Sequence, residues 1–130
     1  MFKVSKKAQY GLRAMAYLAK NYKAKKVCSV KLISKDEDIP FDFLEKIILQ
    51  LEKARLVKGK KGVQGGYTLL KLPQKISVND IVSVLEENKK PVDCSFCGRR
   101  SKCMTKNVWA KLNDSLNKTL KSITLADLIK

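Results

Sequence analysis

Residues 39–70 decide the fold, and they read IPFDFLEKIILQLEKARLVKGKKGVQGGYTLL. Pro40 suits the start of a helix, because the amide that proline lacks has no partner in a first turn. Apolar residues then recur on one helical face and predict a buried stripe of Leu44, Ile47, Ile48 and Leu51. Two β-prone runs, 56–60 and 67–70, flank the glycine-rich residues 61–66 and predict a hairpin directly after this helix.

The residues before this stretch predict two further helices. From Ser5 to Asn21, apolar side chains recur at spacings of three and four and predict an amphipathic helix with Ala8, Leu12, Met15, Ala16 and Ala19 on one face. Ser29 suits the cap of a short second helix, and we expect the acidic residues 36–38 to fill the turn after it. A short helix, a turn and a longer helix form a helix-turn-helix, and the hairpin that follows is a wing.

The C-terminal part predicts two capped helices with a loop and a long helix between them. Ser77 with Asp80, and Thr124 with Asp127, resemble capping boxes. Residues 88–105 form a loop that carries cysteines. After the loop, apolar residues trace a long amphipathic helix: Val108, Trp109, Leu112, Leu116, Leu120 and Ile123. We expect Trp109 to anchor the helical core, and the long helix to serve in dimerisation.

These elements predict a mainly α fold with a small β wing. We expect residues 1–75 to form a winged helix-turn-helix domain that binds DNA. Residues 76–130 then provide a helix, the cysteine loop and a dimerisation helix as one compact unit. A chain of 130 residues suits one modest core, so a single domain that dimerises is the expected organisation.

The charge of the chain limits its partners. It holds 28 Lys and Arg residues against 12 Asp and Glu residues, for a formal net charge of +16. A surface so basic attracts polyanions such as DNA, RNA or the anionic headgroups of a membrane. No apolar run reaches the length of a signal peptide or a membrane span, so we expect a cytoplasmic protein without a membrane partner.

Three cysteines lie close together in the loop, at Cys94, Cys97 and Cys103. In a reducing cytoplasm, closely spaced cysteines more often bind metal or do redox chemistry than form structural disulfides. Thiolates are soft ligands that hold iron–sulfur clusters or zinc, and three of them on one loop can converge on one site. An iron–sulfur cluster is the favoured cofactor; zinc, a regulatory disulfide and thiols without a cofactor are the alternatives.

Four motifs occur in a fixed order: SKKAQYGLRA at 5–14, IP and LEKII within 39–57, KGVQGGY at 61–67, and a tail from Cys103 to ITLADL at 123–128. Together they resemble the Rrf family of bacterial winged-helix transcriptional regulators, in particular its IscR-like and NsrR-like members. The resemblance covers nearly the whole chain. It implies a bacterial homodimer that binds a pseudo-palindromic operator in double-stranded DNA, with repression as the expected output.

By position, the resemblance assigns DNA contacts to the exposed start of the third helix and to the wing. The residues are Asp42, Phe43, Glu45, Lys46, Lys61 and Gln64. A glutamate accepts a hydrogen bond from a cytosine amino group, whereas a lysine contacts guanine or phosphate. We therefore expect Glu45 to supply selectivity and Lys61 to supply affinity. The alternative is that these side chains form only a solvated face.

The fourth ligand of a cluster is open in this sequence. Cys97 and Cys103 keep the separation found in cluster-binding relatives, whereas Cys94 lies nearer to Cys97 than in the usual spacing. The chain has no histidine, and a lysine stands where the IscR-like pattern has one. The weak candidates are Gln9, at the position of an acidic residue in NsrR-like members, and Cys28. A two-iron cluster is favoured over a four-iron one.

Three functions follow from these features. The first is operator binding modulated by a cluster that senses redox state, nitric oxide or iron. The second is the same fold without a cluster, which senses through thiols, zinc, a metabolite or a partner protein. A distant alternative is a redox or metal-handling protein, for which Cys94 and Cys97 have a C-x-x-C spacing. That pair lacks the strand-to-helix context of a thioredoxin site and the chain has no histidine, so we expect no enzyme.

Overall fold

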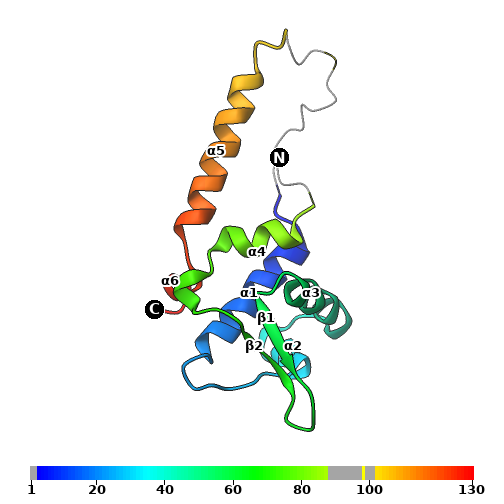
Figure 1. Cartoon of the computed structure of the whole chain (residues 1–130). Coiled ribbons are helices and arrows are strands. Elements are labelled where there is room, and N and C mark those ends of the chain that lie inside the picture. Colours follow the sequence, from blue (N-terminus) through cyan, green and yellow to red (C-terminus); the bar gives the residue numbers. More distant parts are fainter. Residues whose placement is uncertain (1–2, 88–97, 99–101) are drawn as a thin grey trace.

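The computed structural model describes residues 3–87, 98 and 102–130, which form a helical body and one projecting helix (Figure 1). The elements are α1 (Lys6–Lys20), α2 (Val30–Glu37), α3 (Phe41–Lys53), β1 (Val57–Lys60), β2 (Gly66–Leu69), η1 (Pro73–Lys75), α4 (Val78–Leu85), α5 (Lys106–Ser122) and α6 (Leu125–Leu128). The body comprises every element except α5, which extends away from it. The predicted mainly α fold with a small β wing is confirmed.

Helix α1 runs through the middle of the body (Figure 1). It begins after Ser5, whose hydroxyl accepts a hydrogen bond from the Ala8 amide at 3.1 Å. The predicted helix is confirmed, but its buried face is rotated from the expected one. Leu12 and Ala16 are only half-buried, and the buried set is Ala8, Gly11, Ala14, Met15, Leu18 and Ala19. Helices α4 and α6 both pack against α1, which explains why the buried face differs from the expected one.

Helices α2 and α3 form the predicted helix-turn-helix. The Ser29 hydroxyl accepts from the Leu32 amide at 3.1 Å and caps α2. The prediction that residues 36–38 form the turn is wrong in part, because the helix continues to Glu37. The turn rests on Asp38, whose φ of 52° lies in the left-handed region that aspartate tolerates better than most residues. The predicted stripe of α3 is confirmed: Leu44, Ile47, Ile48 and Leu51 are fully buried.

The wing is an antiparallel pair of strands that packs on α1 and α3 and also forms one short backbone bridge with the body. Val57 lies opposite Leu69, and Lys60 lies opposite Gly66. Cys28, just before α2, pairs with Tyr67 by two backbone hydrogen bonds of 3.0 and 2.7 Å and adds a one-residue third strand. A Cβ atom at Gly66 would lie 2.5 Å from the Cys28 carbonyl, so only glycine allows this close approach.

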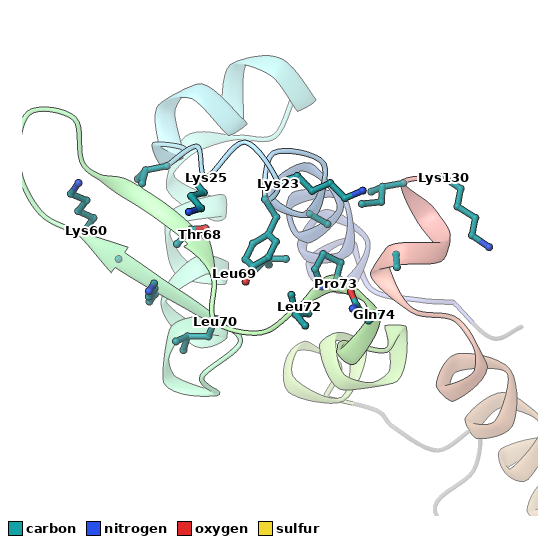
Figure 2. A pocket seen from close by; sticks show the side chains of 17 residues that line it. Lys23, Lys25, Lys60, Thr68, Leu69, Leu70, Leu72, Pro73, Gln74 and Lys130 are labelled. Carbon is teal, nitrogen blue, oxygen red and sulfur yellow. The ribbon is translucent and has the colours of Figure 1, made fainter.

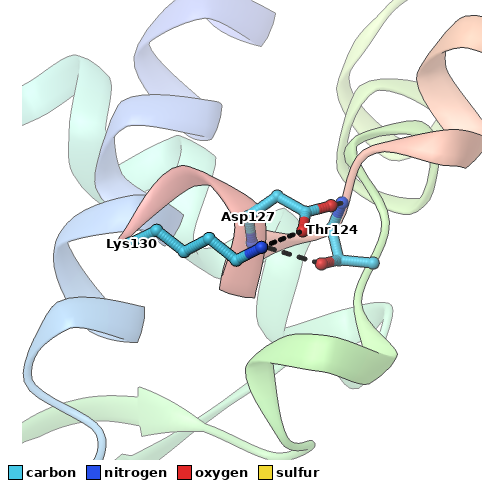
Figure 3. Close-up of polar contacts among 3 residues, drawn as sticks. All are labelled: Thr124, Asp127 and Lys130. Carbon is cyan, nitrogen blue, oxygen red and sulfur yellow. Dashed lines mark hydrogen bonds and ion pairs between the residues drawn. The ribbon is translucent and has the colours of Figure 1, made fainter.

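Both predicted capping boxes are present, and they lie next to each other. Ser77 with Asp80 opens α4, and Thr124 with Asp127 opens α6 (Figure 3). Ser77 and Thr124 also form a β-bridge, whose hydrogen bonds join Val78 to Ile123 at 2.8 Å and Leu125 to Ile76 at 2.9 Å. This bridge, together with the fully buried Leu125 side chain, holds the C-terminus on the body.

Helix α5 is amphipathic, as predicted, but none of its residues is buried. Val108 and Leu116 are 55% and 41% exposed. Trp109 is half-buried, so the prediction that it anchors the core is wrong for the single chain. The helix rests on α4 near its C-terminal end and otherwise leaves its apolar face uncovered (Figure 1).

Candidate nucleic-acid interface

The first half of α3 presents a row of exposed side chains. Asp42, Phe43, Glu45 and Lys46 are all exposed, as the sequence predicted. The buried stripe on the opposite side of α3 holds the helix against α1 and α4, and it fixes the direction of these four side chains. Carboxylate, ammonium and aromatic groups therefore lie together on one helical face that faces outward.

The side chain of Phe43 is held in place more firmly than those of its neighbours on α3, because its ring contacts Tyr10 on α1. The rings of Phe43 and Tyr10 meet edge to face, with centroids 5.6 Å apart and planes at 87°. The Arg13 guanidinium lies 5.5 Å from the centroid of the Tyr10 ring and also donates to the Glu37 carbonyl at 2.9 Å. Tyr10 and Arg13 thus set the position of α3 relative to α1 and α2.

Tyr10 and Arg13 were not predicted as site residues from the sequence. Both stand in the motif at 5–14, where their spacing of three places them on one side of a helix. That spacing could have shown that the two side chains are neighbours. It could not have shown their contact with Phe43, because Phe43 belongs to another helix.

The wing tip carries the two predicted wing residues on its surface. Lys61 and Gln64 are both exposed in the turn between β1 and β2. Gly62 in this turn has a φ of 117°, which other residues rarely adopt. Val63 is fully exposed at the tip, where no apolar contact group had been predicted. The tip therefore offers a cation, an amide and an apolar side chain to a partner.

The positive charge of the chain is largely uncompensated. Among residues 3–87, 98 and 102–130, one ion pair occurs, between Lys130 and Asp127 at 3.9 Å (Figure 3). Lysines that have no carboxylate beside them keep their full attraction for a polyanion. The described helices also include none long and apolar enough to cross a membrane.

Of the three loop cysteines, the structure describes only Cys103. Cys94 and Cys97 lie outside the described residues. Cys103 is half-buried just before α5, and its sulfur lies 3.2 Å from the Thr105 hydroxyl oxygen. In the described part of the chain, no three His, Cys, Asp or Glu side chains gather as a metal site.

The two candidates for a fourth ligand lie in different surroundings. Gln9 is exposed in the first turn of α1, and its amide nitrogen donates to the Val4 carbonyl at 2.7 Å, which leaves the side-chain oxygen available. Cys28 is 0% exposed within the core beside the wing, and burial raises the pKa of its thiol. Burial of this kind disfavours the thiolate form that a metal ligand needs.

A hydrogen bond places the start of α1 beside the segment that leads into the cysteine loop. The Ser5 amide donates to the Glu86 carboxylate at 2.9 Å, and Glu86 directly follows α4. Gln9 lies one helical turn along α1 from Ser5. The sequence supplies three soft thiolates, of which the structure describes only that of Cys103, and thiolates are the ligands that hold iron–sulfur clusters.

Comparison with known proteins gave consistent matches over nearly the whole chain. The family model named Rrf2, described as an iron-dependent transcriptional regulator, matches residues 4–130. The curated Protein rrf2 of Nitratidesulfovibrio vulgaris is 33% identical, and the match covers 98% of this chain and 87% of that protein.

Two solved structures are similar in both sequence and fold. The structure of IscR from T. potens has a TM-score of 0.82 at 39% identity and covers 98% of this chain and 86% of its own. The structure of CymR, the global cysteine regulator of B. subtilis, has a TM-score of 0.84 at 34% identity and covers 99% and 97%.

Proposed function

Because the chain belongs to the Rrf2 family of transcriptional regulators, we propose that it is a repressor whose operator binding depends on an iron–sulfur cluster. It acts as a homodimer on a pseudo-palindromic site in double-stranded DNA, in the bacterial cytoplasm. Its relatives are regulators of transcription, so the chain is not an enzyme.

One observation carries the DNA-binding part: α3 and the wing tip present their predicted contact residues to the outside. Glu45 accepts a hydrogen bond from a cytosine amino group in the major groove, and Lys46 contacts guanine or phosphate. Lys61 and Gln64 contact the backbone and edges of the adjoining minor groove, as wings do. Asp42 and Phe43 lie on the same exposed face and are further DNA contacts in this proposal, with the Phe43 ring held against Tyr10.

The uncovered face of α5 supports the homodimer. Two exposed apolar residues, Val108 and Leu116, lie two helical turns apart, and a second copy of α5 offers the same face. Burying this face in a partner removes apolar surface from water that the single chain leaves exposed. A symmetric dimer then spaces two copies of α3 for successive major grooves.

Three thiolates support the cluster. Cys94, Cys97 and Cys103 would hold it, with Gln9 as a weak fourth ligand, and a two-iron form is favoured. A bound cluster supplies iron that reacts with nitric oxide or oxygen and changes charge on oxidation. The family description as iron-dependent agrees with this assignment.

The chain offers a path from the loop to the DNA-binding helices. Glu86 at the end of α4 holds the first residues of α1 through the Ser5 amide. Farther along, α4 packs so closely on α1 that a Cβ atom at Gly11 would overlap the Leu85 side chain. A change in the loop that shifts α4 must therefore also shift α1, and through α1 the position of α3.

A second function is favoured by the likeness to CymR. That match covers 97% of the CymR chain, and CymR is described as a global cysteine regulator. In this alternative, the chain regulates transcription without a cluster and senses through its thiols, zinc, a metabolite or a partner protein.

A visible absorption spectrum of protein purified without oxygen separates the two functions. We expect sulfur-to-iron charge-transfer bands in the wild type and none in a Cys97→Ala, Cys103→Ala variant. The matched control is Cys28→Ala, which leaves the bands in place. A colourless wild type after anaerobic reconstitution would exclude the cluster and leave the second function.

Operator binding is tested separately, on a duplex recovered by selection from random sequence. We expect Lys61→Ala to weaken binding and to lower the dependence of log affinity on log salt by about one. Glu45→Ala should instead relax the base preference at one position, by about 1–3 kcal/mol. Lys118→Ala on α5 is the control. Equal affinity for selected and scrambled duplexes would overturn the DNA-binding proposal.

A further inference from the structure

A cleft of about 1060 Å3 lies at the base of the wing (Figure 2). Its walls are the wing strands, the connection after α1, the segment around Pro73, and α6. None of the residues lining this cleft comes from α2 or α3. It is therefore separate from the helical face that we assign to the operator, and its size suits a small organic ligand.

The lining of the cleft is strongly basic. Five lysines contribute to it and no acidic residue does: Lys23, Lys25, Lys58, Lys60 and Lys130. Lys130 is paired with Asp127, whereas the other four form no ion pair in the part of the chain that the structure describes. Ammonium groups around one hollow repel one another, and an anion placed among them relieves that repulsion.

The pleat of the wing directs two of these lysines to the cleft. Val57 is buried in the core, and Gly59 lies close to the Tyr67 ring, so this face of β1 packs on the core. Side chains alternate along a strand, and Lys58 and Lys60 therefore share the opposite face. Lys58 pairs with Thr68 on β2, which brings a hydroxyl group to the same wall.

Lys25 is held at the cleft by a tight turn. Its φ of 53° lies in the left-handed region, and its amide donates to the Tyr22 carbonyl at 3.0 Å. Figure 2 shows its side chain reaching from the connection toward the strand that carries Thr68. A residue that is not glycine keeps this conformation only where the surroundings impose it. The turn thus fixes the position of one cation opposite the wing.

Apolar side chains line the cleft beside the lysines. Leu70 and Leu72 are 43% and 42% exposed, although both are large and apolar. Tyr22 and Pro73 extend this apolar wall, and Gln74 adds an amide. A ligand that matches both the lysines and the apolar wall of the cleft therefore combines negative charge with a flat or apolar portion.

We propose that this cleft binds a small organic phosphate of the nucleoside diphosphate class. Its phosphate oxygens lie between Lys25 and the wing lysines, Lys58 and Lys60, because a lysine ammonium is a compact point charge that binds phosphate well. Its ring system covers Leu70 and Leu72. The bound ligand connects the wing with α6, and neither the cluster nor operator binding is needed for it to bind.

Calorimetric titration of the full chain with ADP, without DNA, tests the proposal. We expect saturable binding of one ADP per chain. A Lys25→Gly, Lys58→Gln variant should bind about tenfold more weakly, because two of the four unpaired cations are removed. Lys25→Gly suits the left-handed backbone, so the variant keeps its fold. The matched control, Lys31→Gln with Lys35→Gln on α2, makes the same change in net charge and should leave the affinity unchanged.

The apolar wall is tested by comparing ADP with inorganic pyrophosphate. We expect Leu72→Ser to weaken ADP binding about threefold and to leave pyrophosphate binding unchanged, because only ADP covers the leucine. Three results would overturn the proposal: no saturable ADP binding, equal losses in the cleft and control variants, or pyrophosphate bound as tightly as ADP. If ADP does not bind and the cleft variant loses affinity for duplex DNA, the lysines contact the DNA backbone instead.

Discussion

Helices α3 and α5 have similar amphipathic sequence patterns but differ in how far their apolar faces are buried. Each carries apolar residues on one face, yet α3 buries Leu44, Ile47, Ile48 and Leu51 within 13 residues, whereas α5 buries none within 17. A periodic pattern identifies the face of a helix that must leave water, but it does not identify what covers that face. For α3 the cover is α1 and α4; for α5, we propose, it is a second chain.

Ile47→Ala should have the largest effect, because it opens a hole where α3 meets the body. The side chain is 0% exposed, so its loss removes transfer free energy and leaves a cavity, for a destabilisation of about 3 kcal/mol. The free energy of unfolding in urea measures this change. Leu49→Ala is the control on the same helix, because Leu49 is 47% exposed. Equal effects at the two positions would show that α3 is not packed as described.

Leu116→Asp should leave the fold of the body intact and break the dimer. The residue lies on the uncovered face of α5, and a carboxylate there would be buried without a partner in the proposed interface. We expect the dimer dissociation constant to rise about a hundredfold, equivalent to about 2.7 kcal/mol. Sedimentation equilibrium measures it, with Lys118→Gln on the same helix as the charge-matched control. If Leu116→Asp dimerises like wild type, α5 is not the interface.

The contrast between the two helices also shows which features of the fold could be predicted from the sequence alone. Caps at Ser5, Ser29, Ser77 and Thr124 were predictable because each depends on a hydrogen bond within three residues. The burial of Trp109 was not predictable, because it depends on which element lies beside α5. The rotation of the buried face of α1 has the same origin, since α4 and α6 come from the other end of the chain.

Tyr17→Phe tests the junction of α1 with α2 inside the body. The Tyr17 hydroxyl donates to the Asp36 carboxylate at 2.6 Å, and loss of this bond should lower the free energy of unfolding by about 1 kcal/mol at pH 7. Burial, and then the hydrogen bond to Asp36, raises the pKa of Tyr17. The Tyr17 hydroxyl therefore keeps its proton to a higher pH in the folded state than in the unfolded state.

The alkaline pH dependence follows from that shift in pKa. The stabilisation by Tyr17 is complete below the pKa of the unfolded chain, about 10, and is lost as pH rises above it. Wild-type stability should therefore fall above about pH 10 more steeply than that of Tyr17→Phe. Urea titrations at pH 7, 9 and 10.5 measure the difference, and parallel curves would contradict the assignment.

Lys25→Gly should have the smallest effect on stability, and it should be favourable. The left-handed conformation costs a residue other than glycine about 1–2 kcal/mol. Glycine relieves that strain but adds about 0.4–1 kcal/mol of unfolded-state entropy, so a net gain of about 0.5 kcal/mol is expected. Lys26→Gly, next in the chain, lacks the strain and should only destabilise. A loss of stability in Lys25→Gly would mean that the lysine side chain itself stabilises the turn.

The exposure of the candidate DNA-binding residues was predictable from the sequence. The side chains that lie beside them in the folded chain were not. Helical periodicity places Asp42, Glu45 and Lys46 away from the buried stripe, and the structure agrees. The contact of Phe43 with Tyr10, and the exposure of Val63 at the wing tip, depend on distances between elements. The lysine-lined cleft was missed for the same reason, because its lysines come from segments that are far apart in the sequence.

The bridge between Ser77 and Thr124 has a consequence for how this protein can evolve. It fixes the point where α6 rejoins the body, whatever lies between the end of α4 and the start of α5. The entropy of a closed loop grows only with the logarithm of its length, so insertions and deletions there cost little stability. The segment between α4 and α5, which we propose to be sensory, can therefore change in evolution without loss of the fold, while the DNA-binding half remains under separate selection.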